Sequence, residues 1–181
     1  MLLEATKIDG LYCINYSNFE DLRGRLFKPF VKHIDNKNIS VNLDMKEIWF
    51  TQSHRHVIRA MHMQYGNNSC AKFVTLLYGA ITDVVLDLRR DSKTFGEYVV
   101  FEMNNKQKTA LYIPIGCAHG YLVHEDDTIV MYAATNFHSA VDDIGVRWDS
   151  FGYNWGIDHP ILSDRDLKLP TLDEYNKCQK L

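Results

Sequence analysis

Five segments of mostly apolar sequence each carry one side chain that could move a proton or stabilise the charge left behind. These side chains are His62, Lys72, Asp83, His119 and Tyr132. Taken singly, a strand histidine or tyrosine is usually a core residue with a hydrogen-bond partner, and aspartates near Arg89 and Arg90 are often ion-paired. Together, an imidazole base, a phenolic acid and an ammonium group are typical of an enzyme that removes a proton next to a carbonyl and returns one from the other side.

A metal site is the main alternative for the histidines. Residues 114–119, PIGCAH, resemble a P-x-G-x-x-H pattern that often accompanies a metal held by two histidines of an earlier strand. The earlier segment offers His54, His56 and His62. Beyond His62, however, the second ligand position is occupied by Met or Gln, which suit zinc and iron poorly. We therefore expect no bound metal.

The composition is that of an ordinary globular chain. Of the 181 residues, 46% are hydrophobic, and the net charge of −3 leaves no clustered basic face for nucleic acid. The N-terminal apolar run ends at Glu4, which argues against a signal peptide, and no apolar stretch approaches the ~20 residues of a membrane span. Cys13, Cys70, Cys117 and Cys178 form no C-x-x-C pair. This pattern favours reduced thiols and a cytoplasmic location.

Short β-rich runs separated by polar turns dominate the chain. The expected strands lie within residues 8–16, 47–54, 56–64, 71–79, 80–90, 97–103, 109–116, 120–125 and 128–137. Such spacing predicts a β-sandwich or β-barrel, and we expect one domain over residues 1–181. Alternate side chains then point inward, where each polar one needs a partner or a ligand. Short helices are expected at residues 30–36, after the N-cap Ser163 and in the last dozen residues, so that the tail 163–181 is partly helical.

Six motifs make the sequence recognisable. They are DLRGRLF (21–27), IRAMHMQ (58–64), KFVTLLYGAITDVVLDLRRDSKTFG (72–96), LYIPIGCAHGYLV (111–123), MYAAT (131–135) and ILSDRDLKLP (161–170). In order and spacing they resemble the dTDP-4-dehydrorhamnose 3,5-epimerase family of cupins. The resemblance implies an all-β fold, namely a cupin-type double-stranded β-helix or jelly-roll barrel with short peripheral helices.

The resemblance also implies catalytic roles for six residues. They are the base His62, its orienting carboxylate Asp166, the general acid Tyr132, the enolate-stabilising Lys72, and the second imidazole His119 with its partner Asp83. The 4-keto group of the sugar makes the hydrogens at C3 and C5 acidic, so that removal and return of a proton through an enolate inverts a centre. This chemistry requires no cofactor, and we expect none.

Some substrate-binding positions follow from the same resemblance. Arg59 corresponds to an arginine that holds the diphosphate, and Gln64 ends the same motif. Arg23 corresponds to an arginine that reaches the active site of a neighbouring subunit. The resemblance thus implies a homodimer with exchanged N-terminal segments, which would also cover an exposed sheet edge.

Other substrate-facing positions depart from the family pattern. The usual Q-x-N-x-S segment reads EIWFT here, with Glu47 and Trp49 at two of the polar positions, while Lys28 replaces a common Glu and His138 a tyrosine. A Glu47 carboxylate could accept hydrogen bonds from guanine that thymine cannot offer, and Trp49 could stack on a base or fill space beside a longer sugar. These departures resemble the branch that epimerises GDP-linked 4-keto-heptoses for capsule polysaccharide. We expect that substrate, with dTDP-4-dehydrorhamnose 3,5-epimerase activity as the alternative.

Two further functions remain possible at this level. A 3,4-ketoisomerase would commonly carry a close histidine pair on the base strand and lack the terminal S-D-R-D, so His62 and Asp166 argue against it. A sugar-binding cupin without activity would tolerate loss of His62 or Tyr132, and neither is lost. The residues do not decide between inversion at C3 alone and inversion at both C3 and C5.

Arg59 and His62 pose a geometric problem for this assignment. Residues three apart on a regular strand point to opposite faces. If both side chains serve one site, either the strand has a β-bulge near Ala60, where related sequences often have Gly, or Arg59 lies before the strand begins.

Overall fold

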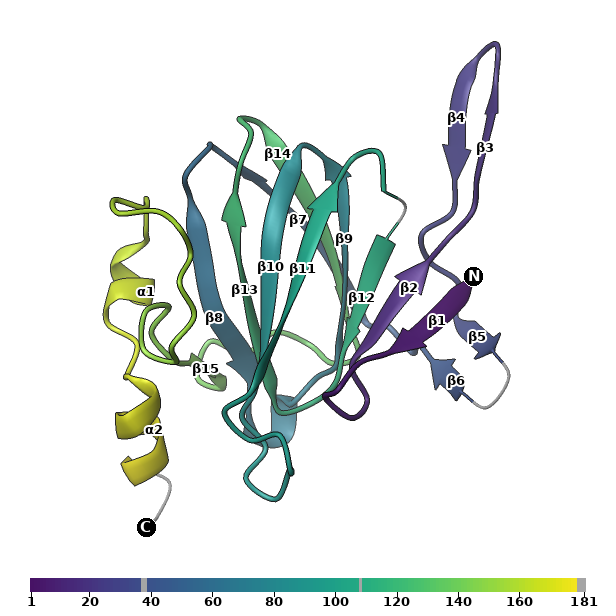
Figure 1. The fold of residues 1–181 in the computed structure, drawn as a ribbon. Helices are drawn as coiled ribbons and strands as arrows, with labels where there is room; N and C mark the ends of the chain where they lie inside the picture. Colours follow the sequence, from purple (N-terminus) through teal and green to yellow (C-terminus); the bar gives the residue numbers. More distant parts are fainter. Residues whose placement is uncertain (37–38, 108, 179–181) are drawn as a thin grey trace.

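Two antiparallel β-sheets form the body of the molecule (Figure 1). The computed structural model describes residues 1–36, 39–107 and 109–178. The six-stranded sheet has the order β1 (Leu2–Ala5), β2 (Tyr12–Asn15), β12 (Thr109–Ile113), β9 (Lys72–Tyr78), β14 (Thr128–Ala134) and β7 (Glu47–Ser53). The five-stranded sheet has the order β11 (Tyr98–Asn104), β10 (Ala80–Asp87), β13 (Cys117–Val123), β8 (Ile58–Gln64) and β15 (Asp143–Gly145). The predicted all-β fold with short peripheral helices is confirmed.

Side-chain alternation explains how the sheets face each other. On β14, Val130 and Tyr132 enter the central core, whereas Ala133 packs on the outer face of its sheet. On β13, Tyr121 enters the same central core and Leu122 packs outside. Because the period of a strand is two, every second residue of these strands faces the space between the sheets.

The outer faces of both sheets are covered. Over the six-stranded sheet, Ile34 of β5 (His33–Asn36) and Val41 of β6 (Ile39–Asn42) belong to a core cluster with Phe73. The predicted helix at residues 30–36 was therefore wrong. Ile34 pairs opposite Val41 in a hairpin, and that pairing buries both side chains against the sheet, which overrides the weak local helical preference.

The C-terminal tail covers the five-stranded sheet. Phe151, Trp155 and Tyr175 cluster with residues of β8, β10 and β13. Helix α1 (Asp164–Leu167) begins after Ser163, whose hydroxyl accepts a hydrogen bond from the Asp166 amide at 3.1 Å, and α2 (Leu172–Cys178) follows. Both predicted tail helices are confirmed within the described residues.

A hairpin of β3 (Asn18–Asp21) and β4 (Gly24–Phe27) projects away from the two sheets (Figure 1). Its apolar side chains Phe19, Leu22 and Leu26 are exposed. A single 3₁₀ turn, η1 (Gly66–Asn68), follows β8. In the described part of the chain, the helices are all too short or too polar to cross a membrane. The four cysteines are free thiols.

The predicted bulge lies in β8. His62 pairs with His119 and Arg59 pairs with Tyr121, so three steps along β8 match two steps along β13. The extra residue brings Arg59 and His62 to the same face of the sheet. Ala60 keeps a negative φ there, and Gly120 lies opposite, where an added Cβ would collide with Ala60.

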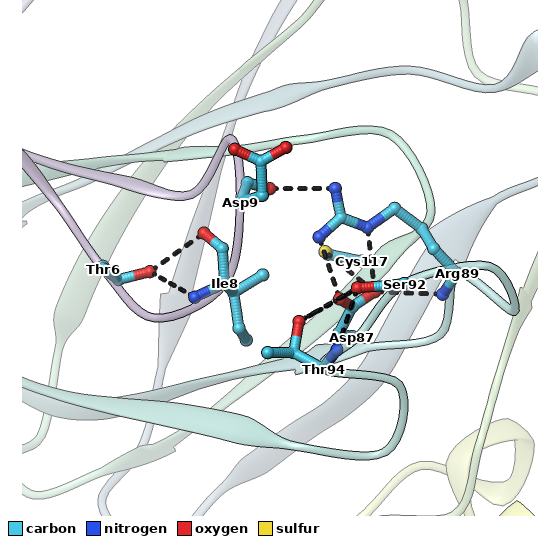
Figure 2. A network of polar contacts seen from close by, with 8 residues as sticks. All are labelled: Thr6, Ile8, Asp9, Asp87, Arg89, Ser92, Thr94 and Cys117. Carbon is cyan, nitrogen blue, oxygen red and sulfur yellow. Dashed lines mark hydrogen bonds and ion pairs between the residues drawn. The ribbon is translucent and has the colours of Figure 1, made fainter.

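A buried carboxylate anchors the loop after β10 (Figure 2). Asp87 is fully buried and accepts hydrogen bonds from the Arg89 guanidinium, Ser92 and Thr94 at 2.6–2.8 Å. Arg89 also donates to the Asp9 carbonyl, which ties the loop to the turn after β1. Burial opposes ionisation of Asp87, but these donors outweigh it and lower its pKa to about 2.

Candidate active site

A cavity of about 230 Å³ collects most of the predicted site residues between the two sheets. Nine predicted side chains line it: His62, Lys72, His119, Tyr132, Glu47, Trp49, Arg59, Gln64 and His138. The cavity exists because inward positions that elsewhere carry aliphatic side chains carry polar ones at this end of the strands. Asp83 and Asp166 contact two of the lining histidines, and Arg23 and Lys28 lie outside it.

His62 is held by a carboxylate from the C-terminal tail. Its Nε2 lies 2.8 Å from Asp166 Oδ1, and Asp166 Oδ2 accepts a hydrogen bond from the Ala60 amide at 3.3 Å. Burial raises the pKa of Asp166, but its hydrogen bond and electrostatic interaction with His62 outweigh burial and lower that pKa below its usual value. The N-cap Ser163 fixes the short helix that carries Asp166. Because Asp166 occupies Nε2, Nδ1 is the ring nitrogen left to act as a base.

Tyr132 stands on the opposite sheet from His62. It belongs to β14 of the six-stranded sheet, whereas His62 belongs to β8 of the five-stranded sheet, and both line the same cavity. The Tyr132 ring stacks on Trp49 with a centroid distance of 5.1 Å and an interplanar angle of 2°. Burial raises the pKa of Tyr132 well above its usual value, so the phenol is protonated and able to donate.

Lys72, His119 and Asp83 form the buried polar floor of the cavity. Lys72 Nζ donates to the His62 carbonyl at 3.2 Å, and burial lowers the pKa of Lys72. His119 Nδ1 lies 3.3 Å from Asp83 Oδ2, while Asp83 Oδ1 is buried with no hydrogen-bond partner among the described residues. Burial raises the pKa of Asp83 well above its usual value and lowers that of His119 well below it. Burial therefore disfavours the charged form of each group, and Nε2 of His119, which does not contact Asp83, is the ring nitrogen left for a ligand.

The rim of the cavity is a polar network that sequence reasoning found only in part. Glu47 Oε2 accepts from the His138 amide at 2.9 Å, and His138 Nε2 lies 3.3 Å from Asp143. Arg165 pairs with the same Asp143 at 2.8 Å. Asp143 and Arg165 line the cavity although neither was predicted, because α1 and β15 meet only in the folded chain.

Gln64 lines the cavity but is largely used by the protein. Its amide donates to the Asn68 and Phe137 carbonyls at 3.0 and 3.1 Å, and its oxygen accepts from the Ser139 amide at 2.6 Å. Its contacts hold the loop after β14 against β8. They leave little hydrogen-bonding capacity for a ligand.

Arg59 lies in the cavity wall, whereas Arg23 lies in an exposed hairpin. Arg59 lines the cavity and donates from Nε to Ser53 Oγ at 3.0 Å, which leaves its terminal nitrogens for a ligand. Arg23 lies in the turn of the exposed β3–β4 hairpin, where it pairs with Asp21. Lys28 follows that hairpin. Neither Arg23 nor Lys28 lines the cavity of its own chain.

Two hydroxyls of the cavity wall were missed. Tyr121 and Thr51 both line the cavity, and their oxygens lie 2.8 Å apart. Each stands two residues from a predicted site residue, His119 and Trp49, so strand alternation could have identified both. The described residues include no group of three or more His, Cys, Asp or Glu placed to hold a metal ion.

Known proteins share this sequence and fold. The family model described as dTDP-4-dehydrorhamnose 3,5-epimerase matches residues 5–174. The dTDP-4-dehydrorhamnose 3,5-epimerase of Salmonella typhimurium is 29% identical over 177 residues, covering 96% of this chain and 97% of that protein.

Solved structures add two ligand complexes. The dTDP-4-dehydrorhamnose 3,5-epimerase of Bacillus anthracis, with TDP and PPi bound, superimposes with a TM-score of 0.85 at 28% identity over 94% of this chain and 99% of that chain. A 3′-monoepimerase from Streptomyces bikiniensis in complex with dTDP-quinovose gives a TM-score of 0.87 at 26% identity over 97% of this chain and 90% of that chain.

Proposed function

Because this chain belongs to the dTDP-4-dehydrorhamnose 3,5-epimerase family, whose members are isomerases, we propose that it epimerises a dTDP-linked 4-keto-hexose at C3 and C5. One observation carries the proposal. His62 and Tyr132 project from opposite sheets into one cavity, which Lys72 and His119 also line. A base and an acid on opposite sides of a bound ring are what inversion of a carbon centre requires.

The reaction follows from the contacts of each residue. His62 Nδ1 removes the proton next to the 4-keto group, and Asp166 stabilises the imidazolium that forms. Negative charge then develops on the keto oxygen, where the Lys72 ammonium and the Nε2–H of His119 stabilise the enolate. Tyr132 delivers its proton to the opposite face and inverts the centre. Positioned acid–base groups of this kind each contribute ~10²–10⁴-fold to rate.

The descriptions of the relatives and the contacts of the rim residues support the proposed dTDP nucleotide. The expectation of a GDP-linked heptose in capsule synthesis rested on departures from the family pattern, among them Glu47 and Trp49. Trp49 stacks on Tyr132 and Glu47 accepts from His138, so both have partners within the protein. The relatives are described as dTDP-sugar epimerases, and the Streptomyces bikiniensis enzyme holds a dTDP sugar. They give no support to a GDP-linked substrate.

We also propose a homodimer joined by the β3–β4 hairpin. The hairpin presents exposed Phe19, Leu22 and Leu26, and Arg23 lies at its turn. Strand β7 is an edge of the six-stranded sheet and exposes Ile48 and Phe50. An unpaired edge beside apolar side chains favours pairing with a second chain. The segments β1 and β2 pair within their own sheet, so the proposed exchange concerns the hairpin alone.

Isotope exchange tests the activity. The protein is incubated in D₂O with dTDP-4-keto-6-deoxyglucose and, separately, with a GDP-linked 4-keto-heptose, and products are analysed by NMR and mass spectrometry. We expect deuterium at C3 and C5 of the dTDP sugar, and loss of inversion in Tyr132→Phe. His54→Ala, an exposed histidine outside the cavity, is the matched control for His62→Ala. Deuterium in neither sugar would overturn the proposed activity, and turnover of the GDP sugar alone would overturn the nucleotide assignment.

A further inference from the structure

A tryptophan lies flat against the proposed general acid. Trp49 and Tyr132 stand directly opposite each other on the neighbouring strands β7 and β14. Their ring centroids lie 5.1 Å apart and their planes differ by 2°, which is the geometry of an offset parallel stack. Both side chains line the cavity between the sheets. The proposed reaction uses Tyr132 but assigns no role to Trp49.

Strand pairing explains why the two rings meet. Residues that stand opposite each other on antiparallel strands project to the same face, with Cβ atoms about 4.5–5.5 Å apart. On its other side Tyr132 pairs with Val74 of β9, which is a smaller side chain. In the described chain β7 is the edge strand of the six-stranded sheet. The indole of Trp49 therefore closes the side of Tyr132 that faces the sheet edge.

The indole also stands at the boundary between two hollows. Trp49, Glu47 and His138 line the cavity, and the same three residues line a second hollow of about 420 Å³ together with Ile48. A smaller side chain at position 49 would join the two spaces. The Tyr132 ring could then swing about its χ1 torsion toward the edge, and its hydroxyl would move with it.

Rings of the opposite sheet do not replace this contact. His119 and Tyr121 of β13 meet the Tyr132 ring at centroid distances of 5.9 and 6.5 Å, with interplanar angles of 61° and 38°. The χ2 torsion of a tyrosine is broad, so a flat neighbour is needed to select one ring plane. The O–H bond of a phenol prefers the plane of its ring. The face of Trp49 therefore limits the directions in which the Tyr132 proton points.

We propose that Trp49 is a positioning residue for the general acid: its indole fixes the place and the plane of the Tyr132 ring, so that the phenolic proton reaches the sugar from one direction. This inference rests on the proposed epimerase function. In the step concerned, the Tyr132 O–H bond breaks and a C–H bond forms at the sugar carbon, while the electron pair stays on Tyr132 Oη. Trp49 exchanges no proton and acts through Tyr132.

Two substitutions separate ring stacking from bulk. Trp49→Leu removes the aromatic face, and we expect kcat for inversion to fall about 10- to 100-fold, because a displacement of about 1 Å at a reacting group can cost about 10²-fold. KM should change by less than about twofold. Trp49→Phe keeps an aromatic face and should stay within about threefold of wild type.

Trp148→Leu is the matched control. Trp148 is a half-buried tryptophan that packs against the outer core cluster, and it lies outside the cavity. We expect this variant to keep the wild-type ratio of exchange to inversion. Circular dichroism verifies that each variant is folded. If Trp49→Leu does not fold, Trp49→Met fills more of the space, lacks an aromatic face and carries the same expectation.

The ratio of exchange to inversion separates positioning from general damage. In D₂O, His62 can exchange a sugar proton on its own face without Tyr132, whereas inversion needs both. Trp49→Leu should therefore raise the ratio of exchange without inversion to inversion, and Trp49→Phe should return it toward wild type. In the Tyr132→Phe background, adding Trp49→Leu should leave the exchange rate unchanged, because the ring that Trp49 holds already lacks its proton donor.

Each outcome bears on one claim. Wild-type protein that neither exchanges nor inverts the dTDP-linked 4-keto sugar overturns the epimerase function and this inference with it. Active wild type with an unaltered ratio in Trp49→Leu overturns the inference alone, as does a Trp49→Phe variant that is impaired as much as Trp49→Leu. A raised KM with unchanged kcat also overturns it, because that pattern indicates that Trp49 binds the substrate itself.

Discussion

The carboxylate that holds the proposed base offers a sharp test of the mechanism. Asp166 accepts two hydrogen bonds, from His62 Nε2 at 2.8 Å and from the Ala60 amide at 3.3 Å. Asp166→Asn preserves the shape but supplies only one accepting end. If the amide oxygen stays on Ala60, the NH₂ group faces His62 Nε2 and drives the ring proton onto Nδ1. The working nitrogen then has no lone pair for the substrate proton.

The structure sets the size of the effect. Turning the amide around restores the His62 contact but opposes the Ala60 N–H with a second donor, and a buried unsatisfied donor costs about 1–3 kcal/mol. Loss of the carboxylate charge removes a further ~1.5–3 kcal/mol from the stabilisation of the imidazolium. A combined loss of about 4 kcal/mol corresponds to a fall in kcat of about 10³-fold.

Solvent deuterium incorporation into dTDP-4-keto-6-deoxyglucose measures this loss, with KM expected near wild type because Asp166 acts through His62. Asp164→Asn changes an exposed carboxylate on the same short helix and is the matched control. Circular dichroism verifies that each variant is folded. A folded Asp166→Asn protein with kcat within about tenfold of wild type would refute the assignment of His62 as the base and Asp166 as its orienting carboxylate.

The remaining predictions concern stability and charge. Asp87→Asn should lower the free energy of unfolding by about 2 kcal/mol at pH 7, because the fully buried carboxyl has a pKa of about 2. Urea unfolding should show this difference between variant and wild type fading as pH falls from about 4 to 2. Asp91→Asn is the exposed control. Lys72→Met should lower kcat about 100-fold while leaving the unfolding midpoint unchanged or raised, since it removes a buried charge. Gly145→Ala should lower the free energy of unfolding by at least about 2 kcal/mol, measured in urea, because the added Cβ meets the Met61 carbonyl oxygen.

The seven- and eight-residue strands of the fold could be read from sequence, whereas most of the four-residue strands could not. Segments such as residues 72–78 are seven-residue runs rich in aliphatic, aromatic and β-branched side chains, and that composition predicts a strand. The strands at residues 2–5, 18–21, 24–27, 33–36 and 39–42 contain four residues each, which is too short to show such a pattern. Their pairing depends on neighbours brought in by tertiary structure, as the failure to predict β5 illustrates.

The residues of the site divide in the same way into those that sequence could predict and those that it missed. Positions on the long strands, such as Lys72 and Tyr132, were placed in one cavity by alternation together with the family resemblance. Asp143 and Arg165 were missed, because their meeting depends on how the tail folds back over β15. Tyr121 was overlooked for another reason. An aromatic residue two positions from a site histidine resembles core, and only the hydroxyls around it reveal a polar role.

The extra residue in β8 fixes the spacing of two side chains that line the cavity. Arg59 and His62 belong to one hydrogen-bonded strand, so the backbone sets the distance between the proposed phosphate-binding arginine and the proposed base. A ligand whose phosphates bind Arg59 would therefore place its other end at a fixed depth in the cavity. A regular pleat with the same number of residues would turn one of the two side chains away, which would separate anchoring from proton transfer without altering either residue.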